Sequence, residues 1–118
     1  MNLKQIFNTT QPIIGVVHLL PLPTSARWGG NLSAIVDRAE QEAVALVSGG
    51  VDGIMIENFF DAPFPKSRVD PAVVSAMTTI VSRLMELVSL PIGINVLRND
   101  SLSAMAIASC YTITFGIM

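Results

Sequence analysis

The sequence predicts an α/β fold in which short apolar strands alternate with amphipathic helices. Three strand-like segments begin near residues 13, 53 and 92, which is a period of about 40 residues. Each segment is continuously apolar, as is typical of a parallel sheet covered by helices. Two architectures share this pattern: an open doubly wound sheet and the beginning of a (β/α)8 barrel. A barrel needs roughly 250 residues, so the 118 residues of this chain would supply about three of its eight units.

The first predicted unit begins with the apolar segment 13–20, which is closed by Pro21-Leu22-Pro23. This pattern predicts a buried strand that leads into a loop. Asn31 is a suitable cap for a helix over residues 32–47, where apolar residues recur at helical spacing. Gly49-Gly50 predicts the end of that helix, because glycine readily adopts the left-handed conformation of a helix terminus.

The second unit repeats this order. Residues 53–59 predict another buried strand. Asp70-Pro71 predicts the start of the next helix, because a capping carboxylate is followed by proline at the first helical position. The apolar stripe of this helix extends to Val88.

The third unit begins at Pro91, and residues 92–97 predict its strand. Asp100 or Asn99 is expected to cap a helix that continues to Ser109. Residues 112–117 alternate weakly in hydropathy and are a candidate fourth strand. We therefore expect one domain over residues 1–118 with about three strand–helix units.

The composition excludes several classes of protein. With 51% hydrophobic and only 14% charged residues, the chain is not expected to be disordered. The net charge is −2 and the seven Lys and Arg residues are spread along the sequence, so no nucleic-acid partner is predicted. The chain has one cysteine, Cys110, and one histidine, which argues against an internal disulfide and a Cys/His zinc site. No metal ion is predicted.

Two segments loosely mimic membrane signals. Residues 4–26 have the order of a secretory signal peptide, but His18 and two prolines interrupt the apolar run. Residues 101–118 carry no charge, but they include three serines and two threonines. We expect neither a signal peptide nor a membrane-spanning helix, and therefore a location on the cytoplasmic side.

Polar residues gather where the predicted strands end. His18 lies near the end of the first strand, Glu57 and Asn58 near the end of the second, and Asn95 near the end of the third. In parallel α/β folds this edge of the sheet is where ligands bind. Since alternate residues of a strand share a face, we expect His18, Glu57 and Asn95 to converge on one pocket.

Two interpretations of these residues remain open. In the functional interpretation, His18 is a general acid or base, Glu57 tunes its charge, and Asn95 and Arg98 bind an oxygen-rich or anionic group. In the structural interpretation, His18 is bonded to a loop and Glu57 forms an ion pair with Arg98 that holds adjacent strand ends together. The spacing of these residues does not name a reaction.

Four segments, in order, resemble the BtpA family of photosystem I biogenesis proteins. They read IGVVHLLPLP (14–23), GGVDGIMIENF (49–59), DAPF (61–64) and PIGINVLRND (91–100). The resemblance covers about Pro12 to Cys110, and the loops around Trp28 and residues 59–65 are most similar to the cyanobacterial branch.

This resemblance implies a (β/α)8 barrel. In cyanobacteria it implies a role in the accumulation or stability of the photosystem I reaction-centre proteins, with peripheral attachment to the thylakoid membrane. Other relatives resemble small-molecule barrel enzymes, so an enzyme acting on a small anionic metabolite is the alternative. The resemblance identifies no cofactor. Together with strand-end geometry it favours His18 and Glu57 as catalytic residues, and Asn58, Asn95, Arg98, Asn99 and Asp100 as ligand-binding residues.

Residues 111–118 depart from the family pattern. The family would continue into a fourth strand, whereas this chain reads YTITFGIM and ends. We interpret the chain as the truncated amino-terminal portion of a barrel, and a non-functional fragment is a further alternative. Such a portion exposes sheet edges, through which oligomers are expected to form.

Overall fold

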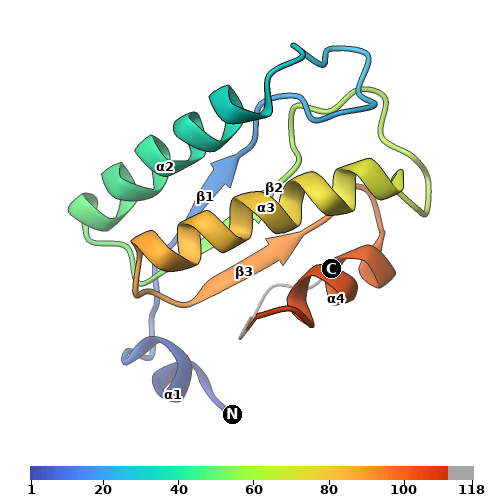
Figure 1. Ribbon diagram of the computed structural model, residues 1–118. Coiled ribbons are helices and arrows are strands. Elements are labelled where there is room, and N and C mark those ends of the chain that lie inside the picture. The colour runs from blue at the N-terminus through green and yellow to red at the C-terminus, as the bar shows by residue number, and fades with distance from the viewer. Residues whose placement is uncertain (112–118) are drawn as a thin grey trace.

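A parallel three-stranded sheet with helices packed along it forms the centre of the molecule (Figure 1). The structure is a computed structural model that describes residues 1–111. Its elements follow the chain in the order α1 (Leu3–Phe7), β1 (Ile14–His18), α2 (Leu32–Gly49), β2 (Gly53–Glu57), α3 (Pro71–Leu87), β3 (Ile92–Asn95) and α4 (Ser101–Ala108). The predicted α/β class and the alternation of strands and helices are confirmed. The candidate fourth strand at 112–117 lies outside the described residues.

The three strands lie side by side in the order β1-β2-β3 and are parallel throughout. Their register places His18 opposite Glu57, and Glu57 opposite Asn95. Partner residues in a parallel sheet point to the same face, so these three side chains share a face at the carboxyl ends of the strands.

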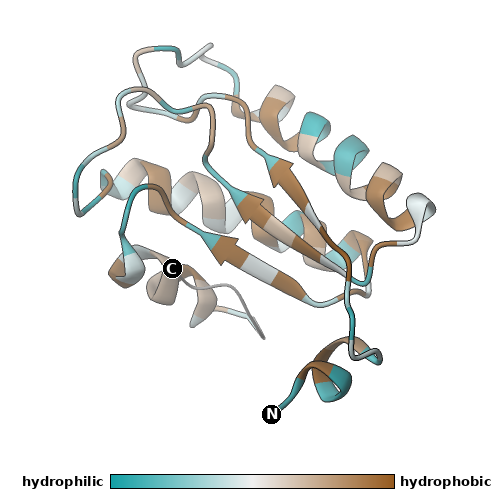
Figure 2. Cartoon of the chain, turned by 180° about the vertical axis from the view of Figure 1, so that it is seen from behind, coloured by the Kyte–Doolittle hydropathy of each residue, from teal (hydrophilic) through white to brown (hydrophobic). Residues whose placement is uncertain are grey.

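The two faces of the sheet differ. Gly15 faces α2, because a Cβ atom built on it would lie 2.6 Å from Leu46. The residues on the face shared with Gly15 are all buried, and they are Val17, Ile54, Ile56, Ile92 and Ile94. They pack under α2 and α3, which both cover this face. Among the described residues no helix crosses the opposite face (Figure 2), where Val16 is 42% exposed.

The predicted helix ends are confirmed by their caps. The side chain of Asn31 accepts a hydrogen bond from the N–H of Ala34 at the start of α2, and Gly50 ends the helix with φ of 90°. Asp70 caps α3 through the N–H of Ala72. At α4 the structure decides between the two candidates, since Asp100 accepts from the N–H of Ser103.

Each strand ends about two residues earlier than predicted, at His18, Glu57 and Asn95. The apolar residues beyond these points belong to loops, whose amides bond to side chains of other loops. Leu97 N–H, for example, donates to the side chain of Asn58.

Helix α1 is an element for which the sequence analysis made no prediction. A capping box joins Asn2 and Gln5 at its start, and this pattern is a usable sequence signal. Its last residue, Phe7, is buried, and a Cβ atom built on Gly53 would lie 2.7 Å from the Phe7 ring. The absence of a side chain at Gly53 therefore lets α1 pack at the amino-terminal end of the sheet.

We expect Gly53→Ala to lower the free energy of unfolding by about 2 kcal/mol, because the added methyl group overlaps a buried ring. Gly49→Ala is the matched control, since nothing lies within 4 Å of the Cβ it would add. Urea denaturation of both variants checks this. Equal stability of the two would contradict the proposed packing of Phe7 on Gly53.

None of the helices within residues 1–111 combines the length and hydrophobicity needed to cross a bilayer.

Candidate functional site

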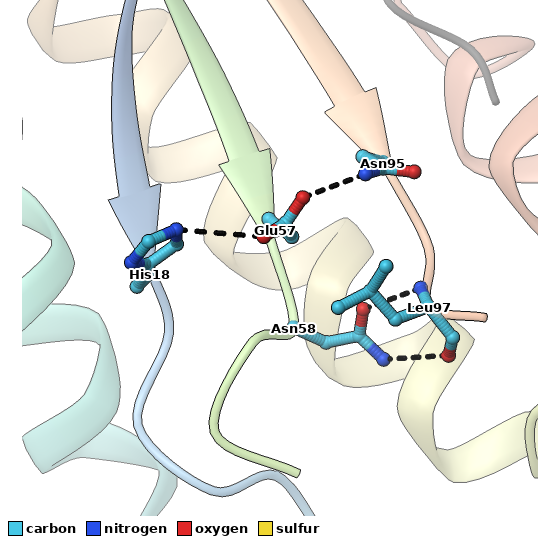
Figure 3. A network of polar contacts seen from close by, with 5 residues as sticks. All are labelled: His18, Glu57, Asn58, Asn95 and Leu97. Carbon is cyan, nitrogen blue, oxygen red and sulfur yellow. Dashed lines mark hydrogen bonds and ion pairs between the residues drawn. The ribbon is translucent and has the colours of Figure 1, made fainter. Parts of the chain in front are cut away.

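The carboxyl ends of the three strands carry a row of hydrogen-bonding side chains, which we call the polar ladder: His18, Glu57 and Asn95 (Figure 3). One oxygen of Glu57, Oε1, lies 3.4 Å from Nε2 of His18. The other, Oε2, accepts a hydrogen bond of 2.6 Å from Nδ2 of Asn95. The three side chains therefore lie together as predicted, but of the three it is His18 that lines the hollow beside them, and Glu57 and Asn95 do not. Their proximity follows from the register, which places all three at the same level of the sheet.

His18 lies in a partly open aromatic corner. Its ring stacks on Phe59 with centroids 4.4 Å apart, and it meets Phe60 in an edge-to-face arrangement with centroids 6.0 Å apart. The side chain of His18 is 40% exposed, whereas that of Glu57 is only 16% exposed. In Figure 3 the Nε2 atom points to Glu57 and the second ring nitrogen points away from it. One nitrogen of His18 thus faces a carboxylate, and the other points away from it. The sequence analysis did not assign Phe59 and Phe60 to the site.

A hollow of about 400 Å³ lies beside His18, at the free edge of β1. Its walls include the apolar side chains of Val16, Leu46 and Phe60. Arg38 and Glu42 also line it, joined by an ion pair of 2.8 Å. The hollow is therefore of mixed polarity and adjoins the polar ladder.

Asn58 directly follows β2, is only 1% exposed, and points toward Leu97 (Figure 3). Its Oδ1 accepts a hydrogen bond of 2.7 Å from the N–H of Leu97, and its Nδ2 donates to the carbonyl of Leu97 at 3.1 Å. The same Nδ2 lies 3.4 Å from Asp61 Oδ2. Asn58 therefore joins the loop after β2 to the loop after β3, and its polar atoms are engaged within the protein.

The side chain of Asp61 joins the loop after β1 to the loop after β2. It is 9% exposed, and its Oδ1 accepts a hydrogen bond of 2.7 Å from the N–H of Leu22. Burial raises the pKa of Asp61 above its ordinary value of 3.8, although the bonds from Leu22 and Asn58 oppose this shift. Ionisation of Asp61 therefore lowers stability as the pH rises through its folded-state pKa.

The side chain of Asp100 joins the loop between β2 and α3 to the start of α4. It is 1% exposed and accepts hydrogen bonds from the N–H of Val69 at 2.6 Å and from both the N–H and the hydroxyl of Ser103. Burial alone would raise the pKa of Asp100, but the bonds from Ser103 and Val69 and the nearby Arg68 together hold it below the ordinary value of 3.8.

Arg98 and Asn99 are exposed in the turn that follows β3. The predicted ion pair between Glu57 and Arg98 is not formed in the described part of the chain, where Glu57 contacts His18 and Asn95 instead. Within residues 1–111, no three side chains of His, Cys, Asp or Glu cluster as a metal site would require.

Comparisons with known proteins identify close relatives. A family model described as the BtpA family matches residues 9–116. The chain is 76% identical over 110 residues to a Synechocystis protein named Photosystem I biogenesis protein BtpA, covering 93% of this chain and 38% of that protein. It is 49% identical over 98 residues to an uncharacterized protein of Methanocaldococcus jannaschii and 43% identical over 98 residues to one of Thermococcus kodakarensis, covering 83% of this chain and 37% of each relative. The chain thus spans about two fifths of the length of these relatives. No solved structure matches.

Proposed function

This chain belongs to the BtpA family, and on that premise we propose that it is the amino-terminal portion of a (β/α)8 barrel that serves photosystem I biogenesis. The observation that carries the proposal is the 76% identity to a relative whose name states that role. The proposed partners are the photosystem I reaction-centre proteins, and the proposed location is the cytoplasmic side of the thylakoid membrane.

The two faces of the sheet support the barrel. Parallel sheets are normally covered on both faces, but here α2 and α3 cover one face and leave Val16 exposed on the other. In a barrel, that open face becomes the interior, where side chains from neighbouring strands stack in layers. Helix α1 would lie at the end of this interior where the strands begin, and the polar ladder would lie at the opposite end, where the strands finish. The proposed domain is accordingly one barrel segment over residues 1–118.

A second candidate function is favoured by the polar ladder. A carboxylate that holds one nitrogen of an imidazole leaves the other nitrogen available to accept a proton from a ligand. Glu57 is itself oriented by Asn95. We therefore assign His18 and Glu57 to proton transfer, and Asn95, Arg98 and Asn99 to the binding of a small anionic metabolite.

The experiment replaces the corresponding part of the Synechocystis protein with residues 9–110 of this chain and measures photosystem I per chlorophyll in the cyanobacterium. The hybrid is expected to support photosystem I at the level of the parent, and deletion of the whole gene is expected to lower it several-fold. A hybrid that accumulates to the parental level but does not support photosystem I would overturn the role in biogenesis.

The same hybrid separates the two functions. His18→Ala and Glu57→Ala are each expected to lower photosystem I as far as the deletion does, while the amount of the hybrid and its binding partners stay unchanged. That result indicates chemistry at the polar ladder. Photosystem I at the parental level in both variants would contradict the enzymatic function and would leave a role of the protein as a scaffold.

A further inference from the structure

The turn between β3 and α4 is anchored at both ends by buried groups. At its start, the N–H and the carbonyl of Leu97 are both bonded to the side chain of Asn58. At its end, the buried carboxylate of Asp100 is bonded to Val69 and Ser103. Only Arg98 and Asn99 lie between these anchors, and both are exposed. The turn therefore presents two polar side chains from a fixed backbone.

The charge balance of this turn favours an anion. Among residues 1–111 the ion pairs are His18–Glu57, Arg38–Glu42 and Arg83–Glu40, so Arg98 is left without a carboxylate partner. The one acidic group of the turn, Asp100, is buried and gives both oxygens to Val69 and Ser103. A guanidinium with free donors is well suited to a carboxylate or a phosphate group.

The turn also follows the polar ladder closely along the chain. Asn95, the last member of the ladder, lies three positions before Arg98 on the same segment. The residue that pins the turn, Asn58, directly follows Glu57 on β2. Glu57 belongs to the polar ladder, whereas the buried Asn58 bonds to Leu97 at the start of the turn (Figure 3).

We propose that Arg98 and Asn99 bind the anionic group, a carboxylate or phosphate, of the ligand at the polar ladder, and that Asn58 is a positioning residue that holds their turn in place. This proposal rests on the second candidate function given above. It changes the expected roles of Asn58 and Asp100, whose polar atoms serve the backbone, from ligand contact to positioning.

The test uses the whole chain, with inorganic phosphate as the probe and hydrogen–deuterium exchange by mass spectrometry as the readout. Phosphate is expected to slow exchange of the amides of residues 96–100. Arg98→Gln should raise the phosphate concentration for half-maximal protection about tenfold, as expected for the loss of one charge-assisted contact. Arg83→Gln, which removes an exposed cation from α3, is the matched control and should change it less than twofold.

Asn58→Ala is expected to raise the half-maximal phosphate concentration about as much as Arg98→Gln, and to speed exchange at Leu97 before phosphate is added. The double variant should bind phosphate no more weakly than the single variant that binds it less well, because Asn58 acts only through the turn that carries Arg98. Protection of α2 and α3 in the same experiment reports whether the variant is folded. If Asn58→Ala does not fold, Asn58→Ser, which keeps a polar group at this buried position, is used with the same criteria.

Three results would overturn the proposal. They are no protection of residues 96–100 by phosphate, wild-type phosphate binding by the folded Asn58 variant, or additive effects in the double variant. None of these results depends on the photosystem I measurement. That measurement contradicts the enzymatic function only if the His18 and Glu57 variants both keep photosystem I at the parental level. The two failures are therefore distinguishable.

Discussion

Replacing Asp100 with alanine is expected to lower the free energy of unfolding by about 3 kcal/mol. The change removes the cap of α4, which contributes about 1 kcal/mol. It also leaves the buried N–H of Val69 without its acceptor, which costs a further 1–3 kcal/mol or so. Urea denaturation at neutral pH measures the loss.

Asp70→Ala is the matched control for this variant. Asp70 also caps a helix, but it is exposed, and within residues 1–111 its side chain bonds to the N–H of Ala72 alone, so a loss of about 1 kcal/mol is expected. If both variants lose the same stability, the bond between Asp100 and the loop before α3 contributes nothing.

The Asp100 variant should also change the response to acid. Because the folded-state pKa of Asp100 is lowered, its contribution to stability is present above the ordinary value of 3.8 and is lost as the pH falls through the folded-state pKa. Asp100→Ala should therefore lose less stability than the parent as the pH falls below about 4. Asp61, whose pKa is raised, acts in the opposite sense.

A Glu57→Gln change is expected to reverse the tautomer of His18. In the parent, the carboxylate of Glu57 lies 3.4 Å from Nε2, so we expect the neutral imidazole to carry its proton on Nε2, where a carboxylate can accept it. In the variant, the single amide oxygen is taken by Nδ2 of Asn95 and the amide NH₂ faces His18. His18 must then accept at Nε2 and carry its proton on Nδ1.

Long-range ¹H–¹⁵N spectra distinguish the two tautomers of a neutral imidazole. His18 is the only histidine of the chain, so its signals need no assignment. Glu40→Gln is the control, because Glu40 pairs with Arg83 and not with the ladder, and it should leave the tautomer unchanged. A proton on Nδ1 in the parent, or an unchanged tautomer in Glu57→Gln, would show that Glu57 does not orient His18.

The sequence determined the order of strands and helices, because the signals for these elements are local. Apolar periodicity identified the buried strands, and Asn31, Asp70 and Gly50 marked helix ends through bonds to residues within a few positions. The level of His18, Glu57 and Asn95 at the carboxyl ends of their strands could also be predicted, since parallel strands bring equivalent ends to one edge. Helix α1 was not predicted, although its capping box is local, and its packing depends on the contact between Phe7 and Gly53.

Tertiary structure alone decided which polar groups meet. The sequence offered both His18 and Arg98 as partners for Glu57, and the register selected His18, because Arg98 lies beyond the end of β3 in a turn. The sequence also did not distinguish Asn58 and Asp100, which are buried, from the polar residues that face solvent. Their burial depends on how three loops, distant in sequence, dock on one another through backbone amides. Such bonds leave no periodic pattern in the chain, so they become visible only when the loops are placed in space.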